Sequence, residues 1–320
     1  MKIIDIINSA QSENKCRFAF ELLPPLKGDD INTIFNTVDK LMAFDPAYIN
    51  ITYHREDVKY IEREGGFLER LITKKRPGTV AISAALMARY QIEVVPHLIC
   101  GGFSRIDTED ALIDLSFLGI NNVLALRGDN LKNEKVFTPS PSGHSNAIEL
   151  VEQIVGMNRG WYQDSEVEQS HATDFCIGVA GYPEKHIESP NADMDMSYLK
   201  KKVDAGADYI VTQMFFDNRH YFSFVERCRK AGIKVPIIPG IKPLSTKGQL
   251  SMLPQIFHVD IPQPVACKVS SAQNNSEVRK IGVEWAIKQC EELKNSGVPI
   301  IHFYTMGKSD NIEAIASTIF

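Results

Sequence analysis

The sequence predicts an α/β protein, a single (β/α)8 TIM barrel with parallel strands. Short apolar runs alternate with amphipathic helical segments, an order that gives parallel strands joined by right-handed crossovers. Eight such runs occur, at residues 17–23, 47–52, 93–100, 122–126, 175–181, 209–214, 235–239 and 300–305. This number favours a closed barrel, with an open doubly wound sheet as the structural alternative.

The apolar runs are nearly continuous, as expected of strands buried on both faces. The segments between them carry apolar stripes with a helical period, clearest at residues 29–44 and 277–294. Several helices are predicted to stop at a glycine shortly before the next strand, because glycine readily adopts the left-handed conformation that ends a helix. These glycines are Gly119, Gly206, Gly232 and Gly297.

Length and composition indicate one folded domain. The 320 residues suit a single barrel, and no linker rich in Pro, Gly or Ser divides them. We therefore expect one catalytic domain over residues 1–320, with a polar surface insertion at 159–174. The net charge of −5 argues against a nucleic-acid partner, because a phosphate backbone needs a basic excess. No apolar run reaches the length of a membrane span, so no membrane partner is expected.

The cysteine pattern indicates a reducing, cytoplasmic environment. Six cysteines are scattered without a Cys-x-x-Cys pair, and residues 1–15 do not resemble a secretion signal. The histidines lack the spacing of a zinc helix and no acidic loop has calcium-ligand spacing, so we expect no metal.

Glu21 is the first catalytic candidate. In a barrel of this class the active site lies at the carboxyl ends of the strands. Glu21 is a carboxylate inside the apolar run 17–23. Desolvation raises the pKa of such a group, which suits a general acid near neutral pH. An internal carboxylate paired with a buried Arg or Lys is the structural alternative.

Other polar groups collect at the same ends of successive predicted strands. They are Thr52 to His54, His97, Arg127 to Asp129, Tyr182 to His186, and Thr212 with Gln213. A lone histidine such as His97 is also typical of a hydrogen-bonded core residue. The sequence has no Walker-type phosphate loop and no Rossmann glycine motif. The lysine run 200–202 could face a pyrophosphate or be a solvated helix face.

Eight short motifs at these strand ends resemble the methylenetetrahydrofolate reductase family, in its short bacterial catalytic form. They are FELLPP at 20–25, PHL at 96–98, ALRGD at 125–129, GYPEKH at 181–186, KVDAGA at 202–207, TQMFFD at 212–217, IIPGIKP at 237–243 and HFYT at 302–305. Each is weak alone, but together they keep the family's order along nearly the whole chain.

The resemblance implies a FAD-containing barrel that reduces 5,10-methylenetetrahydrofolate to 5-methyltetrahydrofolate with NAD(P)H, in a ping-pong hydride transfer. It implies tightly bound FAD and favours NADH as electron donor, with NADPH possible. It also implies a homo-oligomer and, for a chain of this length, no C-terminal regulatory domain. The alternative is a flavin-independent, folate-binding barrel of the methyltransferase type.

The resemblance also assigns roles by position. Glu21 matches the family's general acid, and Asp129 the acidic residue near the flavin and the pterin ring. The residues that match cofactor contacts are Tyr53, His97, Arg127, Gly128, Asp129, Ala147, Tyr182, His186, Ser189, Asp195, Lys201 and Lys202. The residues that match substrate contacts are Thr52, Asp129, Gln213, Gln249 and Lys308.

Some positions depart from the family pattern. Leu22 and Leu23 replace an aromatic pair, and Lys308 replaces an arginine that binds the folate's glutamate tail. Lysine keeps the positive charge but loses the bidentate fork. Ser189, Tyr198 and Lys201 also differ from the residues common in the family.

Overall fold

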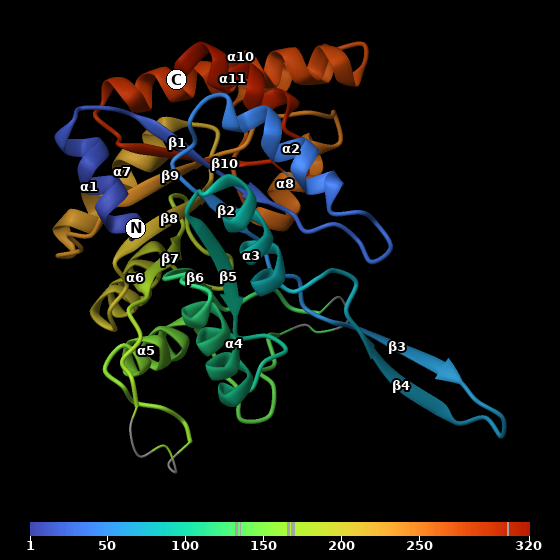
Figure 1. Cartoon of the computed structure of the whole chain (residues 1–320). Coiled ribbons are helices and arrows are strands. Elements are labelled where there is room, and N and C mark those ends of the chain that lie inside the picture. The colour runs from blue at the N-terminus through green and yellow to red at the C-terminus, as the bar shows by residue number, and fades with distance from the viewer. Residues whose placement is uncertain (132–133, 135, 165–166, 168–169, 306) are drawn as a thin grey trace.

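The structure is a computed structural model that describes residues 1–131, 134, 136–164, 167, 170–305 and 307–320. Eight parallel strands close into a barrel in the order β1-β10-β9-β8-β7-β6-β5-β2 (Figure 1). The barrel strands are β1 (Arg17–Leu22), β2 (Ile49–Ile51), β5 (Val94–Ile99), β6 (Asn122–Leu126), β7 (Cys176–Gly181), β8 (Tyr209–Met214), β9 (Ile237–Ile241) and β10 (Ile300–Tyr304). The predicted barrel is thus confirmed, and the open-sheet alternative is wrong.

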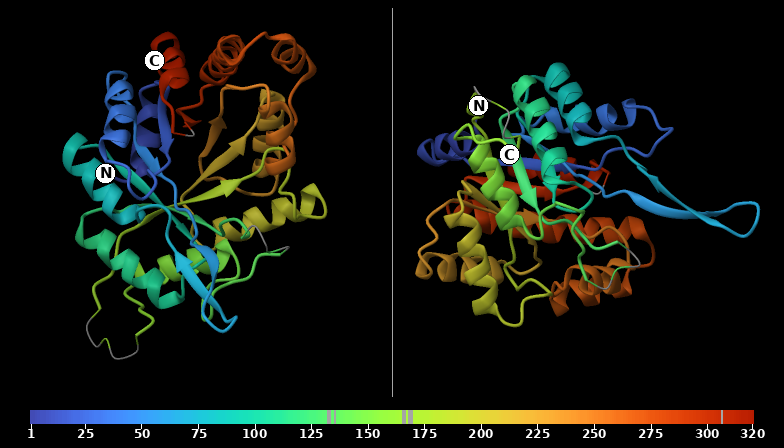
Figure 2. Two further views of the ribbon diagram at one scale, coloured as in Figure 1. Left: turned by 90° about the vertical axis from the view of Figure 1, so that its right-hand side faces the viewer. Right: turned by 90° about the horizontal axis from the view of Figure 1, so that it is seen from below.

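Helices surround the barrel (Figure 2). They are α2 (Asn32–Met42), α3 (Thr79–Tyr90), α4 (Arg105–Phe117), α5 (Ala147–Met157), α6 (Ala192–Asp204), α7 (Asn218–Lys230), α10 (Asn275–Asn295) and α11 (Asp310–Ile319). Two further helices, α8 (Gln249–Phe257) and α9 (Gln263–Ser271), lie between β9 and α10. The four predicted helix-ending glycines all have positive φ angles, from +73° at Gly119 to +122° at Gly206.

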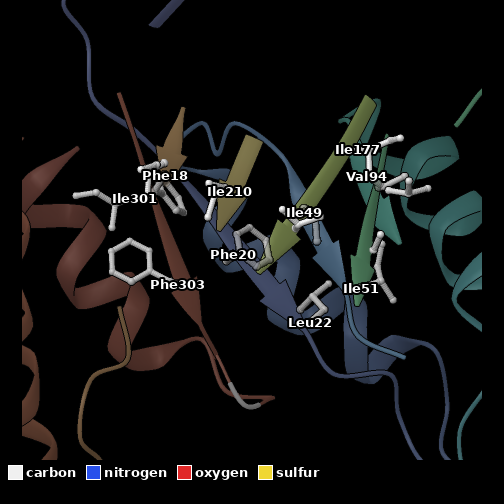
Figure 3. Packing of buried hydrophobic residues seen from close by; sticks show 14 of the residues in the cluster. Phe18, Phe20, Leu22, Ile49, Ile51, Val94, Ile177, Ile210, Ile301 and Phe303 are labelled. Atoms are coloured by element: carbon white, nitrogen blue, oxygen red, sulfur yellow. The ribbon is translucent and has the colours of Figure 1, made fainter. Parts of the chain in front are cut away.

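The strands separate two apolar layers. Outward side chains pack beneath the helices, among them Phe18, Phe20 and Leu22 of β1 (Figure 3). Inward side chains, such as Ala19 and Tyr209, fill the barrel. Helix α1 (Ile3–Ser12) packs against this inner layer, and the N–H of Ile3 donates to Oδ1 of Asn122 at the start of β6 (2.9 Å). Helix α1 therefore covers the amino-terminal end of the barrel and leaves the opposite end for the site.

One feature was not predicted. Strands β3 (Asp57–Glu62) and β4 (Leu68–Thr73) form an antiparallel hairpin that projects away from the barrel after β2 (Figures 1 and 2). Residues 159–174 connect α5 to β7, as expected of an insertion between these elements, but 165, 166, 168 and 169 lie outside the described residues. None of the helices in the described part combines the length and apolar character that crossing a bilayer requires.

Candidate active site

Glu21 lies at the carboxyl end of β1 and faces the barrel interior, because its neighbours Phe20 and Leu22 point outward into the helix-facing core. Its side chain is only 16% exposed. Burial raises the pKa of this carboxyl to about 8, while the Lys242 charge acts to lower it. The group is therefore protonated at neutral pH. Among the described residues no Arg or Lys nitrogen lies within ion-pair distance of the Glu21 carboxyl, so the buried Lys242 acts on it only through its charge.

Among the described residues, His97 is the one basic side chain within 4.0 Å of the Glu21 carboxyl. It faces inward from β5, and its Nε2 lies 3.9 Å from Oε2 of Glu21. Burial, reinforced by His302 and His54, lowers the pKa of His97 to about 3. The ring is thus neutral at pH 7. Its Nε2 is buried without a hydrogen-bond partner among the described residues, so the reading of His97 as a satisfied core histidine is not supported at this atom.

Strand β10, which pairs with β1, supplies His302 and Tyr304 to the barrel interior. Nδ1 of His302 accepts from the Asn50 amide of β2 (3.3 Å), and burial lowers the His302 pKa to about 3. The Tyr304 hydroxyl donates to the Thr212 carbonyl of β8 (2.6 Å). Register pairs Glu21 with Tyr304. The two β10 side chains beside the acid are therefore hydrogen-bonded and neutral at pH 7.

Residues that come after β6 and β7 along the chain form a second side of the site, here called the wall. Gly128 has a φ of +85°, and a Cβ there would come within 3.2 Å of Ile99, so glycine lets the backbone turn close to β5. Arg127 pairs with Glu188, its second guanidinium nitrogen lying 3.0 Å from Oε1. The Tyr182 ring stands edge-on to His186, with centroids 4.6 Å apart. Asp129 is exposed, and its charge acts on Tyr182 and His54.

Helix α6 contributes Asp195 and Lys202 to this wall. Asp195 accepts from the Ser189 hydroxyl (2.9 Å) and from the His186 amide (3.2 Å). Nζ of Lys202 donates to the Ala180 carbonyl of β7 (2.5 Å), and burial lowers its pKa to about 8. Lys201, one residue earlier, is exposed and lies over the Tyr198 ring at 5.9 Å. The lysine run is therefore split, with Lys202 turned inward and Lys201 outward.

The remaining predicted residues lie at the same end of the barrel. Thr52 follows β2, and its hydroxyl donates to the Leu22 carbonyl (3.2 Å), with Tyr53 next to it. Ala147 is the first residue of α5, and Gln213 lies on β8. The amide oxygen of Gln249, at the start of α8, accepts from the Ser245 N–H (2.6 Å).

A cavity of about 700 Å³ is lined by residues that follow β9, by Tyr304 of β10 and by helices α10 and α11. Lys242, Gln249, Thr305 and Lys308 line it, together with Arg279 and Lys280 of α10. Its walls are rich in cations, so the chemistry favours an anionic ligand. Lys308, the residue that departs from the family pattern, is exposed at its edge. Within the described residues, no group of three or more His, Cys, Asp or Glu could hold a metal ion.

Comparison with known proteins decides the family. The sequence model described as methylenetetrahydrofolate reductase matches residues 6–319. This chain belongs to the methylenetetrahydrofolate reductase family. The 5,10-methylenetetrahydrofolate reductase of Salmonella typhimurium is 30% identical over 97% of this chain and 93% of that protein. The predicted resemblance to the short bacterial form is thus confirmed, and the family is one of oxidoreductases.

Longer relatives share the same region. Methylenetetrahydrofolate reductase (NADH) 1 of Arabidopsis thaliana is 33% identical over 96% of the chain, which spans 48% of that protein's length. The chain thus spans about half the length of the plant and yeast relatives that it matches. Among solved structures, a Clostridium thermocellum protein described as binding two copies of 5-methyl-5,6,7,8-tetrahydrofolic acid superposes with a TM-score of 0.55 at 13% identity, covering 97% of this chain and 96% of that one. This likeness shows the fold.

The wall formed by β6, β7 and α6 fits the flavin dinucleotide that the family resemblance implies. It offers a buried cation at Lys202, aromatic surface at Tyr182 and a close backbone approach at Gly128. Oδ1 of Asn130 is also buried there without a partner among the described residues. An aromatic ring system that carries phosphates and hydrogen-bonding edges matches this set of groups.

Sequence reasoning missed three residues of the acid's surroundings. Asn50, Lys242 and His302 all face the barrel interior near Glu21. Lys242 and His302 lie inside quoted motifs, and the alternation of inward and outward residues along each strand could have identified all three.

Proposed function

We propose that this chain reduces 5,10-methylenetetrahydrofolate to 5-methyltetrahydrofolate, with FAD as cofactor and a reduced nicotinamide as electron donor. One observation carries the proposal: Glu21 is a carboxyl group held in the neutral form at the open end of the barrel, with a pKa raised to about 8 by burial. Membership of the family supports this reaction, and the neutral carboxyl group of Glu21 supplies the proton that the reaction requires.

The acid has a defined task in this reaction. The folate's methylene carbon bridges two nitrogens, and hydride can reach it once one carbon–nitrogen bond has opened. Glu21 donates its proton to the departing nitrogen, so that the nitrogen leaves as a neutral amine. His97 lies 3.9 Å away, but burial lowers its pKa to about 3, so its ring does not take that proton. Glu21 is thus the proton donor. Asp129 has the role that the resemblance assigns to it, which is to hydrogen-bond the pterin ring.

The cofactor wall has a separate task. Bound FAD would accept hydride from the nicotinamide and supply it to the folate. Lys202 and Arg127 would hold its negatively charged groups, while Tyr182, His186 and Gly128 would position its rings. Tyr53, His97, Ala147, Ser189, Asp195 and Lys201 complete the proposed cofactor set, as assigned by resemblance.

The cationic cavity would receive the anionic tail of the folate. Lys308 and Gln249 lie on its lining. Gln213, on β8, would contact the folate and the nicotinamide in turn, and Thr52 the nicotinamide. We further propose NADH as donor, in keeping with the name of the Arabidopsis thaliana relative. A cytoplasmic homo-oligomer is the proposed working form, and all six cysteines are free thiols, as in a reducing compartment.

Anaerobic absorption spectroscopy tests the proposal. The purified protein should be yellow, should bleach on addition of NADH, and should regain its colour when 5,10-methylenetetrahydrofolate is added. Glu21→Gln should bleach as the wild type does but regain colour at least about 100-fold more slowly, because it has lost the proton donor. A protein that stays colourless after incubation with FAD would overturn the proposal in favour of a flavin-independent, folate-binding barrel.

A further inference from the structure

Lys242 is a buried ammonium group in the layer that contains Glu21. It follows directly after β9 and is 3% exposed. Register pairs Gly240 with His302 and Ile241 with Phe303, so Lys242 lies at the level of Tyr304, which in turn pairs with Glu21. Gly240 and Ile238 face inward, whereas Ile241 joins the helix-facing core. By this alternation Lys242 points into the carboxyl-terminal opening of the barrel. Its strand, β9, is separated from β1 by β10.

The surrounding structure fixes the position of Lys242. Pro243 and Leu244, which follow it, are buried. A Cβ at Gly282 of α10 would come within 2.0 Å of the Leu244 carbonyl oxygen, so α10 lies directly against this segment. The Lys242 ammonium has no hydrogen bond to the rest of the described chain, although it lines the cavity beside Gln249 and Lys308. A lysine this deeply buried is ordinarily paired.

Lys242 differs in charge from the other groups around Glu21. His97 of β5 and His302 of β10 are neutral at pH 7, since burial lowers both pKa values to about 3. His54, after β2, has a lowered pKa, and burial raises the pKa of Tyr304 well above its usual range. Asn50 of β2 is uncharged. Burial lowers the Lys242 pKa to about 8 and the Glu21 carboxyl acts to raise it, so the ammonium is charged at pH 7.

We propose that Lys242 is a positioning residue for the proton-transfer step, its ammonium stabilising the Glu21 carboxylate that proton donation creates. In that step the O–H bond of Glu21 breaks, an N–H bond forms on the departing folate nitrogen, and the carbon–nitrogen bond opens. The negative charge left on Glu21 then lies opposite a fixed cation instead of alone in a buried site. This inference rests on the proposed function for its catalytic consequence, but the electrostatic coupling exists in the substrate-free protein.

Titration of Glu21 tests the coupling directly. Infrared difference spectroscopy of the substrate-free holoenzyme follows the carboxyl C=O band, and Glu21→Gln identifies which band belongs to Glu21. Lys242→Met should raise the titration midpoint of Glu21 by about one pH unit or more, since removing a nearby cation disfavours the carboxylate. Lys242→Arg, which keeps the charge, should restore a midpoint near that of the wild type.

A matched control separates coupling from general loss of positive charge. Lys280→Met removes an exposed cation from the lining of the same cavity and should leave the Glu21 midpoint unchanged. Lys242→Gln, with thermal unfolding measured alongside, replaces Lys242→Met should the latter fail to fold. An unchanged Glu21 midpoint in a folded Lys242→Met or Lys242→Gln variant overturns the inference, whatever reaction the protein catalyses.

The catalytic consequence appears in the separate half-reactions. In stopped-flow measurements at pH 7, Lys242→Met should slow reoxidation by 5,10-methylenetetrahydrofolate about 10-fold or more and leave bleaching by NADH within about two-fold. The pH at which reoxidation declines should move upward with the Glu21 midpoint. If the Glu21 midpoint shifts in Lys242→Met but the wild-type protein reduces no folate, the proposed function is overturned. The coupling between Lys242 and Glu21 is then still supported. Equal slowing of both half-reactions would contradict a role specific to Glu21.

Discussion

At the scale of single residues, Glu21 shows how a carboxyl group is kept protonated without a special partner. Burial inside the barrel removes it from water, while the nearest basic side chain, His97, is itself too deeply buried to be charged. The same burial has a cost to folding. In the unfolded chain a glutamate ionises near pH 4.5, whereas in the folded chain Glu21 retains its proton up to about pH 8.

Stability should therefore depend on pH through this residue. Between pH 4.5 and about 8 the folded state binds one more proton at Glu21 than the unfolded state, so its contribution to stability falls as pH rises. Glu21→Gln removes that decline. We expect the variant and the wild type to be similar in stability at pH 5, with the variant on the order of 2–4 kcal/mol more stable at pH 8. Urea unfolding at both pH values measures this difference.

The exposed Glu226→Gln serves as the control, because Glu226 pairs with Lys230 on the surface of α7. Its stability relative to the wild type should change little between pH 5 and pH 8. A Glu21→Gln advantage that did not grow with pH would contradict a raised pKa at Glu21.

The sequence indicated some of these residues but not their grouping. Glu21 was recognisable because a carboxylate inside an apolar run is rare. Lys242 was not, because the strand was predicted at 235–239, whereas β9 spans Ile237–Ile241. This shift of two residues moved Lys242 from a loop to the barrel mouth. The split between Lys201 and Lys202 likewise depends on the rotation of α6, which adjacent identical residues do not reveal.

At the scale of elements, the contact between α10 and the segment after β9 positions one side of the site. Gly282 allows this contact, since a side chain there would overlap the Leu244 backbone. Leu244 lies two residues beyond Lys242. Displacing α10 should therefore disturb both the packing and the cavity.

Gly282→Ala should lower the free energy of unfolding by about 1–3 kcal/mol, because the added methyl group overpacks a fixed contact. It should also slow folate-dependent reoxidation more than bleaching by NADH. Gly248→Ala is the matched control: its new Cβ would meet nothing within 4 Å, and its φ of −59° suits alanine. Chemical denaturation and stopped-flow spectroscopy of both variants measure the effects, and equal destabilisation would contradict the packing argument.

The hairpin β3–β4 escaped prediction for a physical reason. Its strands mix charged and apolar residues, as in the cross-strand pair of Tyr60 and Arg70, so neither the period of a helix nor the continuous apolar run of a buried strand is present. Both faces are largely exposed. The barrel strands were predictable because burial on both faces leaves a continuous apolar signal.

At the scale of the whole molecule, the two ends of the barrel have different roles. Helix α1 covers the amino-terminal end with Ile3, Ile6 and Ile7, which join Tyr48 and Tyr209 in the inner core. The polar side chains of the site occupy the opposite end. The sequence predicted the eight-strand barrel and its functional end, but not this covering helix, because no predicted strand precedes its short apolar stretch.

Ile7→Ala should therefore destabilise the protein without impairing the site. Ile7 is fully buried, and removing its side chain should lower the free energy of unfolding by about 2–4 kcal/mol. Bleaching and reoxidation rates at 25 °C should stay within about two-fold. Ile4→Ala, at a partly buried position on the same helix, should cost less than half as much. A large loss of turnover in a folded Ile7→Ala variant would contradict the independence of the two ends.

The pairing of β1 with β10 has a consequence for biosynthesis. These strands are the first and last of the barrel in sequence, yet they are neighbours in the ring. As the chain leaves the ribosome, β1 has one edge without a partner until β10 emerges, so the nascent barrel is an open sheet with two free edges. Translation that stalls before β10 should leave a species prone to association through those edges. Completing the ring is thus a single late event that depends on the last barrel strand.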